Sequence, residues 1–349
     1  MRTAHLHGVN RISYVLPLRS DRRLSDEFVA YVRWLASRCE VIVVDGSPGP
    51  VFDDLDRRCA NGIRHLSPDG AFRHFLNGKV AGVLTGVGLA THERVVIADD
   101  DVRYDDGALD EAVRGLDGAE IVRPQNYFDP HPWHACVDTA RTLINRTTGG
   151  DWPGTLVVRR SALLRSGGYR GDVLFENLEL VRTIVALGGR ERVAYGLFVR
   201  RLPPPTRHFL SQRVRQAYDE FARPLRMGVW LALIPALALL RRRYGRRALF
   251  ASAVAAIGCA EVGRRRAGGT RVFPLVASLL APMWLLERGV CAWLALGVRV
   301  VRGGVPYRGR ILRQAATPFR ELRRAARSRD RFWSLSEPER TTRPPRPAT

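Results

Sequence analysis

The chain begins with short apolar runs that alternate with segments of helical apolar spacing. Residues Ile12–Leu18 and 41–44 are apolar runs that end in turn residues, which is typical of buried strands. Between them, residues 26–38 carry apolar side chains every three or four positions and predict a helix. A second helix is expected at about 78–91, before the apolar run Arg94–Ala98. This alternation predicts an α/β fold with a mostly parallel sheet and helices on both faces.

After a break at Pro203-Pro-Pro205 the pattern changes. An amphipathic stretch leads into apolar blocks of 10 to 15 residues, several of which end in arginine clusters: 227–240, 248–262, 272–286 and 289–298. Such punctuation is typical of membrane helices with cytoplasmic anchors. The blocks are shorter than the roughly 20 residues that a spanning helix needs. Some are therefore expected to be interfacial or re-entrant, and buried helices of a soluble domain are the alternative.

The charge distribution separates the same two parts. Residues 1–222 hold 30 Arg and Lys against 28 Asp and Glu, whereas residues 223–349 hold 26 Arg against 6 Asp and Glu. A segment this basic favours nucleic acid or an anionic membrane surface. Nucleic-acid binders interleave basic residues with stacking aromatics on a polar face. The apolar blocks do not fit that pattern, so we expect this part of the chain to bind a membrane and not a nucleic acid. We expect a catalytic domain at 1–222, membrane-associated helices at 223–303 and a basic, partly disordered tail at 304–349.

Three consecutive aspartates, Asp99, Asp100 and Asp101, follow the run Arg94–Ala98. Open α/β sheets bind ligands at the carboxyl ends of their strands. Adjacent carboxylates repel one another, and a hard cation such as Mg²⁺ or Mn²⁺, often shared with substrate phosphates, relieves that repulsion. The alternative is an acidic turn, because Asp105-Asp106-Gly107 continues the polar stretch.

Several segments follow one another in a recognisable order: SYVLPLRSD, VIVVDGS, NGKVAGVLTGVGLA, VVIADDDV, SGGYRGDVLFENLEL and SQRVRQAYDEF. This order resembles the family-2 glycosyltransferases with a GT-A fold. More narrowly, it resembles the membrane-associated subset that includes ceramide glucosyltransferases and polysaccharide synthases. A later VPYRGR at 305–310 is similar to the W-R-G-R element of some of these enzymes.

The resemblance implies a GT-A-type sheet followed by C-terminal membrane-associated helices. It also implies an inverting, divalent-metal-dependent transfer of a sugar from a nucleotide diphosphate sugar. The acceptor would be membrane-held, a lipid, at the cytoplasmic face of the cell membrane. Two other functions stay open: a nucleotidyltransferase, and a degenerate glycosyltransferase-like module that docks on membranes without catalysis.

On the donor side, the resemblance assigns Asp99 and Asp101 to the metal, Mn²⁺ or Mg²⁺. Donor-binding roles fall on Pro17, Asp45, Lys79, Asp99 and Asp100. Asp45 corresponds to the aspartate that holds the nucleoside base, although it can also serve only to form a turn. Lys79 lies where the family has a donor-site lysine, and a solvated cation at a helix start is the alternative.

On the acceptor side, the resemblance implies a catalytic base at Glu176 or Glu179. Many relatives have Glu-Asp where this chain has Glu176-Asn177, and an asparagine cannot accept the proton of an acceptor hydroxyl. Glu176 can alternatively be a charge favoured by the N-terminal end of a helix. The departure at Asn177 is one reason to keep the non-enzymatic alternative.

The segment Gln212-Arg213-Val214-Arg215-Gln216 resembles a Q-x-x-R-W element with glutamine in place of the tryptophan. The resemblance assigns Gln212, Arg213 and Arg215 to the acceptor and diphosphate site, where arginine suits phosphate oxygens. A basic interfacial helix is the alternative. Trp133 and Trp152 are further candidates to line an acceptor cleft, because sugars and lipid chains pack on aromatic faces.

Overall fold

The computed structural model describes residues 11–59, 62–307 and 310–328. Its main sheet has the strand order β3-β2-β1-β4-β7-β6-β8-β5. The strands are β1 (Ile12–Leu18), β2 (Glu40–Asp45), β3 (Ile63–Leu66), β4 (Arg94–Ala98), β5 (Val102–Arg103), β6 (Ile121–Phe128), β7 (Thr155–Arg159) and β8 (Glu191–Arg201). The pairs β1–β2, β1–β4, β2–β3 and β6–β8 are parallel. Strand β7 runs antiparallel to β4 and β6, and β5 to β8.

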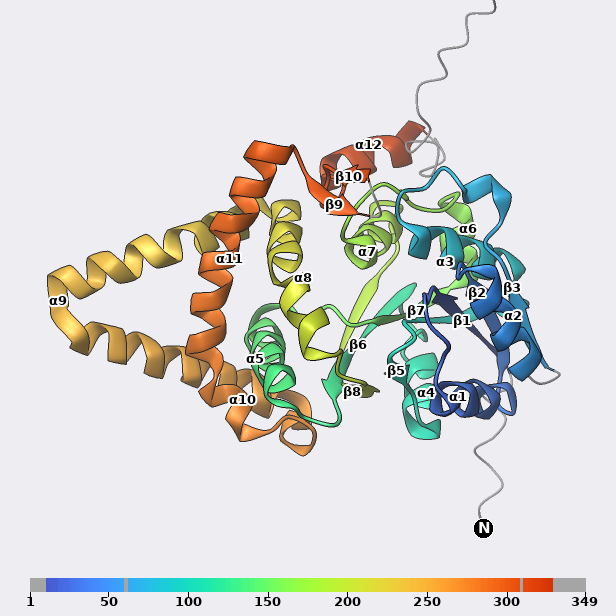
Figure 1. Ribbon diagram of the computed structural model, residues 1–349, viewed down its shortest axis with the longest axis horizontal. Helices are drawn as coiled ribbons and strands as arrows, with labels where there is room; N and C mark the ends of the chain where they lie inside the picture. The colour runs from blue at the N-terminus through green and yellow to red at the C-terminus, as the bar shows by residue number, and fades with distance from the viewer. Residues whose placement is uncertain (1–10, 60–61, 308–309, 329–349) are drawn as a thin grey trace, which may run out of the picture.

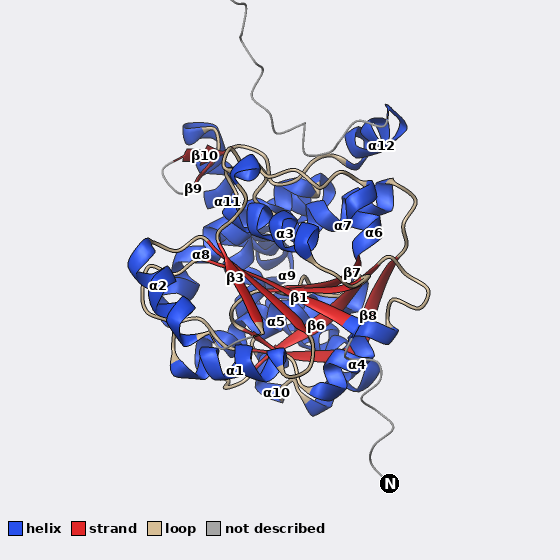
Figure 2. Cartoon of the chain, turned by 90° about the vertical axis from the view of Figure 1, so that its right-hand side faces the viewer, coloured by secondary structure: helices blue, strands red, loops and turns tan. Residues whose placement is uncertain are grey.

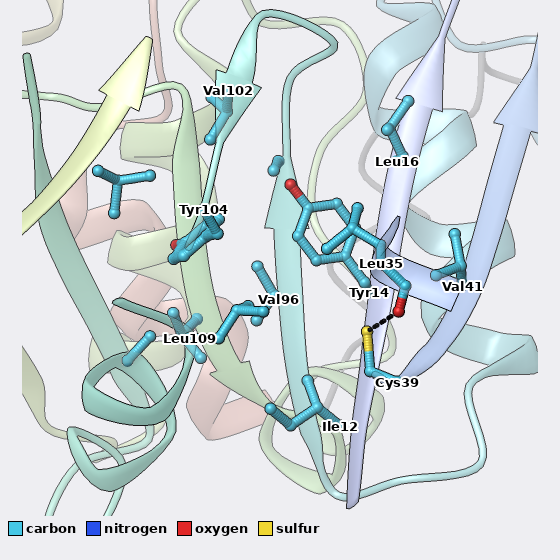
Figure 3. Packing of buried hydrophobic residues seen from close by; sticks show 14 of the residues in the cluster. Ile12, Tyr14, Leu16, Leu35, Cys39, Val41, Val96, Val102, Tyr104 and Leu109 are labelled. Atoms are coloured by element: carbon cyan, nitrogen blue, oxygen red, sulfur yellow. Dashed lines mark hydrogen bonds between the residues drawn. The ribbon is translucent and has the colours of Figure 1, made fainter. Parts of the chain in front are cut away.

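Helices cover both faces of this sheet (Figure 2). They are α1 (Asp26–Ala36), α2 (Gly49–Arg58), α3 (Gly78–Leu89), α4 (Asp106–Arg114), α5 (Trp133–Thr148), α6 (Arg160–Arg165), α7 (Glu176–Ala186) and α8 (Thr206–Tyr218). Alternate residues of β1 point to opposite faces. Tyr14 and Leu16 pack with α1 and α4 (Figure 3), whereas Val15 packs with α3 and α7. The predicted α/β fold with a mostly parallel sheet and helices on both faces is confirmed.

Helix α3 lies unusually close to the sheet because of two glycines in the segment NGKVAGVLTGVGLA. A Cβ atom on Gly86 would lie 2.4 Å from Cγ1 of Val15, and one on Gly82 would lie 2.9 Å from Cβ of Pro17. Only glycine permits this approach. It brings the first turn of α3 to the ends of β1 and β4.

The apolar blocks form three helices, α9 (Pro224–Arg265), α10 (Leu275–Leu279) and α11 (Ala281–Arg302). Helix α9 consists of two arms that meet at Gly245, whose φ of 73° is in the left-handed region and breaks the helix. In Figure 1 the two arms reach away from the sheet and α11 runs between their ends. The ends pack with α5, α8 and α11 in a second apolar core.

The stretch Pro224–Arg271 is long and apolar enough to cross a membrane, with a mean hydropathy of 1.4 in its most apolar window. Only 11% of that window is buried. The bend at Gly245 places Arg241, Arg242, Arg243, Arg246 and Arg247 at the junction of the arms, far from the sheet (Figure 1). The apolar blocks 227–240 and 248–262 are thus the two arms of one bent helix.

The described part of the segment at 304–349 forms β9 (Val305–Tyr307), β10 (Arg310–Leu312) and α12 (Phe319–Ser328). Apolar side chains hold these elements in place, because Leu312 and Ala315 join the second core and Leu322 is fully buried against α7. The rest of the tail, 329–349, lies outside the described residues.

Candidate functional site

The three aspartates occupy a tight turn between β4 and β5. The N–H of Asp99 donates to the carbonyl of Gly154 at 2.8 Å, and the N–H of Val102 donates to the carbonyl of Asp99 at 3.1 Å. The carbonyl of Asp101 accepts from the N–H of Leu202 at 2.8 Å. The turn is therefore fixed from both sides, by the loop before β7 and by the end of β8.

Two cations contact the aspartates, and one of them, Lys79, also contacts Glu176. Lys79 Nζ lies 2.5 Å from Asp99 Oδ1 and 2.8 Å from Glu176 Oε1. Arg201 lies 2.9 Å from Asp101 Oδ2 and 3.5 Å from Asp99 Oδ2. Burial acts to lower the pKa of Lys79, but Asp99 and Glu176 outweigh it and the pKa is raised. The lysine is therefore a permanent cation beside the aspartate turn.

Asn77 explains why Lys79 meets a residue 97 positions further along the chain. Its side chain caps α3 by accepting from the N–H of Lys79 at 3.1 Å. The same side chain donates to the carbonyl of Val173 at 3.2 Å, and the N–H of Asn77 donates to the carbonyl of Gly171. The start of α3 is thus tied to the loop that leads into α7, so the predicted donor lysine and the predicted base come together.

A cavity of about 500 Å³ opens at the carboxyl ends of β1 and β2, on one side of the aspartates. We call it the α3 cavity. It is lined by Pro17, Leu18, Arg19, Gly46, Pro68, Asp69, Phe72, Arg73, Phe75, Leu76, Gly78, Lys79, Ala81, Asp99, Asp100, Tyr307 and Arg310. Four of these residues are cations, which suits an anionic ligand such as a diphosphate.

A second cavity, of about 230 Å³, lies on the other side of the aspartates. We call it the α8 cavity. It is lined by Asp101, Phe128, His134, Ala135, Asp138, Arg141, Asn145, Trp152, Phe175, Arg201, Pro204, His208, Phe209, Gln212, Gln216, Asp219, Glu220, Arg223, Arg226 and Arg288. The two cavities thus meet at the aspartate turn, with Asp99 and Asp100 on one and Asp101 on the other.

The aspartates can accommodate a divalent ion. Asp101 Oδ1 is buried and has no hydrogen-bond partner in the described part of the chain. Gly154 leaves room beside Asp99, because a Cβ atom there would lie 2.7 Å from Asp99 Oδ2. Within residues 11–59, 62–307 and 310–328, no group of three or more His, Cys, Asp or Glu side chains is arranged to hold a metal ion, so any ion here would take only two carboxylates from the protein. Two carboxylates with remaining positions for phosphate oxygens are a usual Mg²⁺ or Mn²⁺ arrangement.

Of the other predicted donor residues, Pro17 and Lys79 line the α3 cavity and Asp45 lies just below it, next to Gly46. Asp45 is 1% exposed, accepts from the N–H of Ser47 at 2.7 Å and lies 3.2 Å from His65 Nε2. Burial acts to raise its pKa, but these contacts outweigh it and the pKa is lowered. Asp45 therefore holds the turn in ionised form, which fits the turn-forming alternative as well as base recognition.

The two candidate bases differ sharply in their surroundings. Glu176 lies at the start of α7, directly after Phe175 of the α8 cavity, and pairs with Lys79 of the α3 cavity. Neither glutamate lines a cavity itself, but Glu179 is fully buried and accepts from the N–H of Thr317 at 2.7 Å. Asn177 donates to the carbonyl of Pro153 at 3.0 Å, so its amide holds the loop before β7. The geometry favours Glu176.

Only some residues of the predicted acceptor element on α8 line a cavity. Gln212 and Gln216 line the α8 cavity. Arg213 is 5% exposed and pairs with Asp138 at 3.0 Å and with Glu287 at 2.6 Å, so its charge is already balanced within the protein. Arg215 donates to Gln212, and its guanidinium lies over the ring of Tyr307 at the other cavity.

Only one of the two candidate tryptophans lines a cavity. Trp152 lines the α8 cavity, as expected. Trp133 is 58% exposed and packs against His134 and Phe209 instead of lining either cavity.

Three functional candidates escaped the sequence reasoning as individual residues: Arg201, Arg288 and Arg310. All but one of the 56 basic residues are arginine, so a single arginine gives no signal in this chain. The one hint was the segment VPYRGR, because its Tyr307 and Arg310 line the α3 cavity. Residues 308 and 309 of that segment lie outside the described residues.

No protein-family model matches the sequence, and no curated protein is significantly similar to it. Three solved structures are similar at low identity. The mannosyltransferase PcManGT from Pyrobaculum calidifontis, in complex with GDP-Man and Mn²⁺, is 18% identical over 81% of this chain and 87% of that chain, with a TM-score of 0.48.

Glucosyl-3-phosphoglycerate synthase from Mycobacterium tuberculosis, in complex with Mn²⁺, uridine diphosphate and phosphoglyceric acid, is 18% identical over 57% of this chain and 73% of that one, with a TM-score of 0.41. Mannosyl-3-phosphoglycerate synthase from Rubrobacter xylanophilus is 15% identical over 58% and 69%, with a TM-score of 0.39. These likenesses do not bear on the ceramide glucosyltransferase subset.

Proposed function

We propose that this protein is an inverting glycosyltransferase that uses a nucleotide diphosphate sugar and a divalent cation. The observation that carries the proposal is the meeting of two cavities at Asp99 and Asp101, where Lys79 pairs with both Asp99 and Glu176. A transferase needs such a layout, because donor and acceptor must approach one reacting carbon from opposite sides.

The donor fits the α3 cavity, which has the larger volume and four cations. Asp99 and Asp101 would hold Mn²⁺ or Mg²⁺, which when bound neutralises charge on the leaving diphosphate. Lys79 and Arg201 lie beside the same carboxylates and keep positive charge there. They would stabilise the diphosphate as the bond to the sugar breaks.

The acceptor fits the α8 cavity, where Trp152 and Phe175 offer aromatic faces. An acceptor hydroxyl would attack the anomeric carbon as the carbon–oxygen bond to the diphosphate breaks. Its proton would pass to the carboxylate of Glu176, and the bonding electrons would leave with the diphosphate. Lys79 orients Glu176 through the 2.8 Å pair.

We further propose that the acceptor is held at the cytoplasmic face of the cell membrane. Support comes from α9, whose arms expose large apolar side chains: Leu225, Val229, Leu239, Phe250, Val254 and Val262. The arginines at the junction of its arms suit anionic headgroups. An apolar arm that ends in basic residues can lie in the headgroup region without spanning the membrane.

A screen of nucleotide sugars against membrane lipid extract tests the proposal. Full-length protein in detergent is incubated with Mn²⁺, and release of the nucleoside diphosphate is measured with and without lipid. Release that requires Mn²⁺ and increases with lipid is the expected result. Donor binding without any turnover would favour the non-catalytic module, and release of pyrophosphate would favour a nucleotidyltransferase. If the full-length protein fractionates with the cytosol in the absence of detergent, the proposal that the protein binds the membrane is contradicted.

A further inference from the structure

The α8 cavity contains a buried cation that the proposed chemistry does not use. Arg288 projects from α11, is 2% exposed, and has no hydrogen-bond partner for Nε or Nη1 in the described part of the chain. The adjacent Glu287 is paired with Arg213. A buried guanidinium with unused donors is costly unless an anion meets it.

The other arginines of this cavity are engaged, with one exception. Arg141 pairs with Asp138 at 3.1 Å and also with Asp151, and Arg201 pairs with Asp101. Arg226 lies 3.2 Å from Glu220 and donates to Asn145.

The exception is Arg223, which reaches Glu220 through Nη2 at 3.2 Å while its buried Nε has no partner in the described residues. Unused donors thus concentrate on Arg288 and Arg223.

The acidic residues of the cavity do not cancel this charge. Asp101, Asp138 and Glu220 are each paired with at least one arginine, and the cavity is lined by five arginines. Burial raises the pKa of Asp219 to about 7, so near neutral pH this carboxyl is about half protonated. The cavity therefore has an excess of positive charge, and it is enclosed enough to strengthen contacts with an anion.

We propose that Arg288 and Arg223 form a binding site for a phosphate group of the acceptor, on the side of the α8 cavity away from the donor. This inference rests on the proposed transferase function and narrows the acceptor to phosphorylated compounds. Two arginines can meet a phosphate through several N–H donors at once. The rest of the acceptor would extend past Phe175 toward Glu176, which follows it directly in the chain.

Inorganic phosphate is the first probe, and it needs neither donor nor turnover. Calorimetric titration of the full-length protein in detergent with EDTA measures its affinity, with chloride at matched ionic strength as reference. Arg288→Met should weaken phosphate binding at least tenfold. Arg302→Met, which changes an exposed arginine of the same helix that lines neither cavity, should leave it within twofold. Equal binding by Arg288→Met and the wild type would overturn the proposal.

Thermal unfolding separates an anion site from a structural arginine. In chloride, Arg288→Met should unfold at the same temperature as the wild type or higher, because a buried unpaired charge has been removed. Phosphate should raise the unfolding temperature of the wild type only. Asp219→Asn should bind phosphate more tightly. If it instead unfolds more easily and binds no better, Asp219 is the partner of Arg288 and the site does not exist.

Two further probes distinguish the source of the phosphate. Vesicles of neutral lipid containing a polyprenyl phosphate, compared with the corresponding polyprenol, test a lipid acceptor. Glucose 1-phosphate without vesicles tests a soluble one. Binding to either that is lost in Arg288→Met supports the site, whereas binding to neither overturns it. Because these assays omit the nucleotide sugar, their failure would leave the transferase proposal standing.

Discussion

The sharpest test of the proposed mechanism compares two carboxylates of one helix. Glu176→Gln should lower turnover by roughly two to four orders of magnitude, the usual effect of losing a general base. This corresponds to about 2.7–5.5 kcal/mol of transition-state free energy. Glutamine has nearly the same shape but cannot take the proton of an acceptor hydroxyl.

Donor binding should change little in the same variant. Glutamine can still accept a hydrogen bond from Lys79, which keeps its 2.5 Å contact with Asp99. Because glutamine keeps this hydrogen bond and Lys79 keeps its charge, the donor dissociation constant should change by no more than about fivefold, or about 1 kcal/mol. Calorimetry with Mn²⁺ and single-turnover kinetics on full-length protein measure the two quantities separately.

Glu179→Gln is the matched control. Burial raises the pKa of Glu179 although the bond from Thr317 acts to lower it, and a raised pKa suits a base. Its position argues otherwise, because it is fully buried and its carboxylate contacts Thr317, whereas Glu176 contacts Lys79 of the α3 cavity. We expect about 1–3 kcal/mol less stability and near-normal turnover. Loss of turnover in Glu179→Gln alone would move the base there. Full activity in both variants would refute a carboxylate base in this segment.

Further changes test other parts of the structure. Asp101→Asn should abolish Mn²⁺-dependent donor binding measured by calorimetry while the unfolding temperature stays the same; unchanged affinity would contradict the metal assignment. Serine at the five arginines within 241–247 should weaken binding to anionic vesicles by about 1 kcal/mol per arginine in a flotation assay. Gly86→Ala should destabilise the fold by about 1–3 kcal/mol in urea unfolding because its Cβ would overlap β1, whereas Gly88→Ala, with nothing within 4 Å, should stabilise it by about 0.5–1 kcal/mol. Two aspartates raise the pKa of His65 above 6.5 even though burial acts to lower it. Its contribution to stability should therefore be complete below pH 6.5 and decline as the pH rises through the raised value.

The sequence predicted an element correctly where the spacing of apolar residues within a short segment determined its structure. The expected helices at 26–38 and 78–91 end two residues earlier, as α1 and α3, because apolar spacing does not mark the last turn. The apolar blocks were located correctly, but periodicity could not show that two of them are arms bent at Gly245. A single left-handed glycine between arginines decides that shape.

The site was predictable only where a motif marked it. The motif order singled out Lys79 and Glu176, and the structure brings them together through Asn77. Arg201 and Arg288 could not be found in this way, because they reach the cavities from β8 and α11 by tertiary packing. In a chain so rich in arginine, only the spatial position of each guanidinium distinguishes a functional residue from a solvated one.

The order of elements links the exposed apolar helices to both cavities. Helix α8, which carries Gln212 and Gln216, precedes α9, and the segment with Tyr307 and Arg310 follows α11. The chain therefore leaves one cavity, forms the exposed apolar arms, and returns to the other. An orientation that α9 adopts on a lipid surface must then fix both cavities relative to that surface. Helix α11, which carries Arg288 in its first half, would then present the α8 cavity to an acceptor held in the membrane.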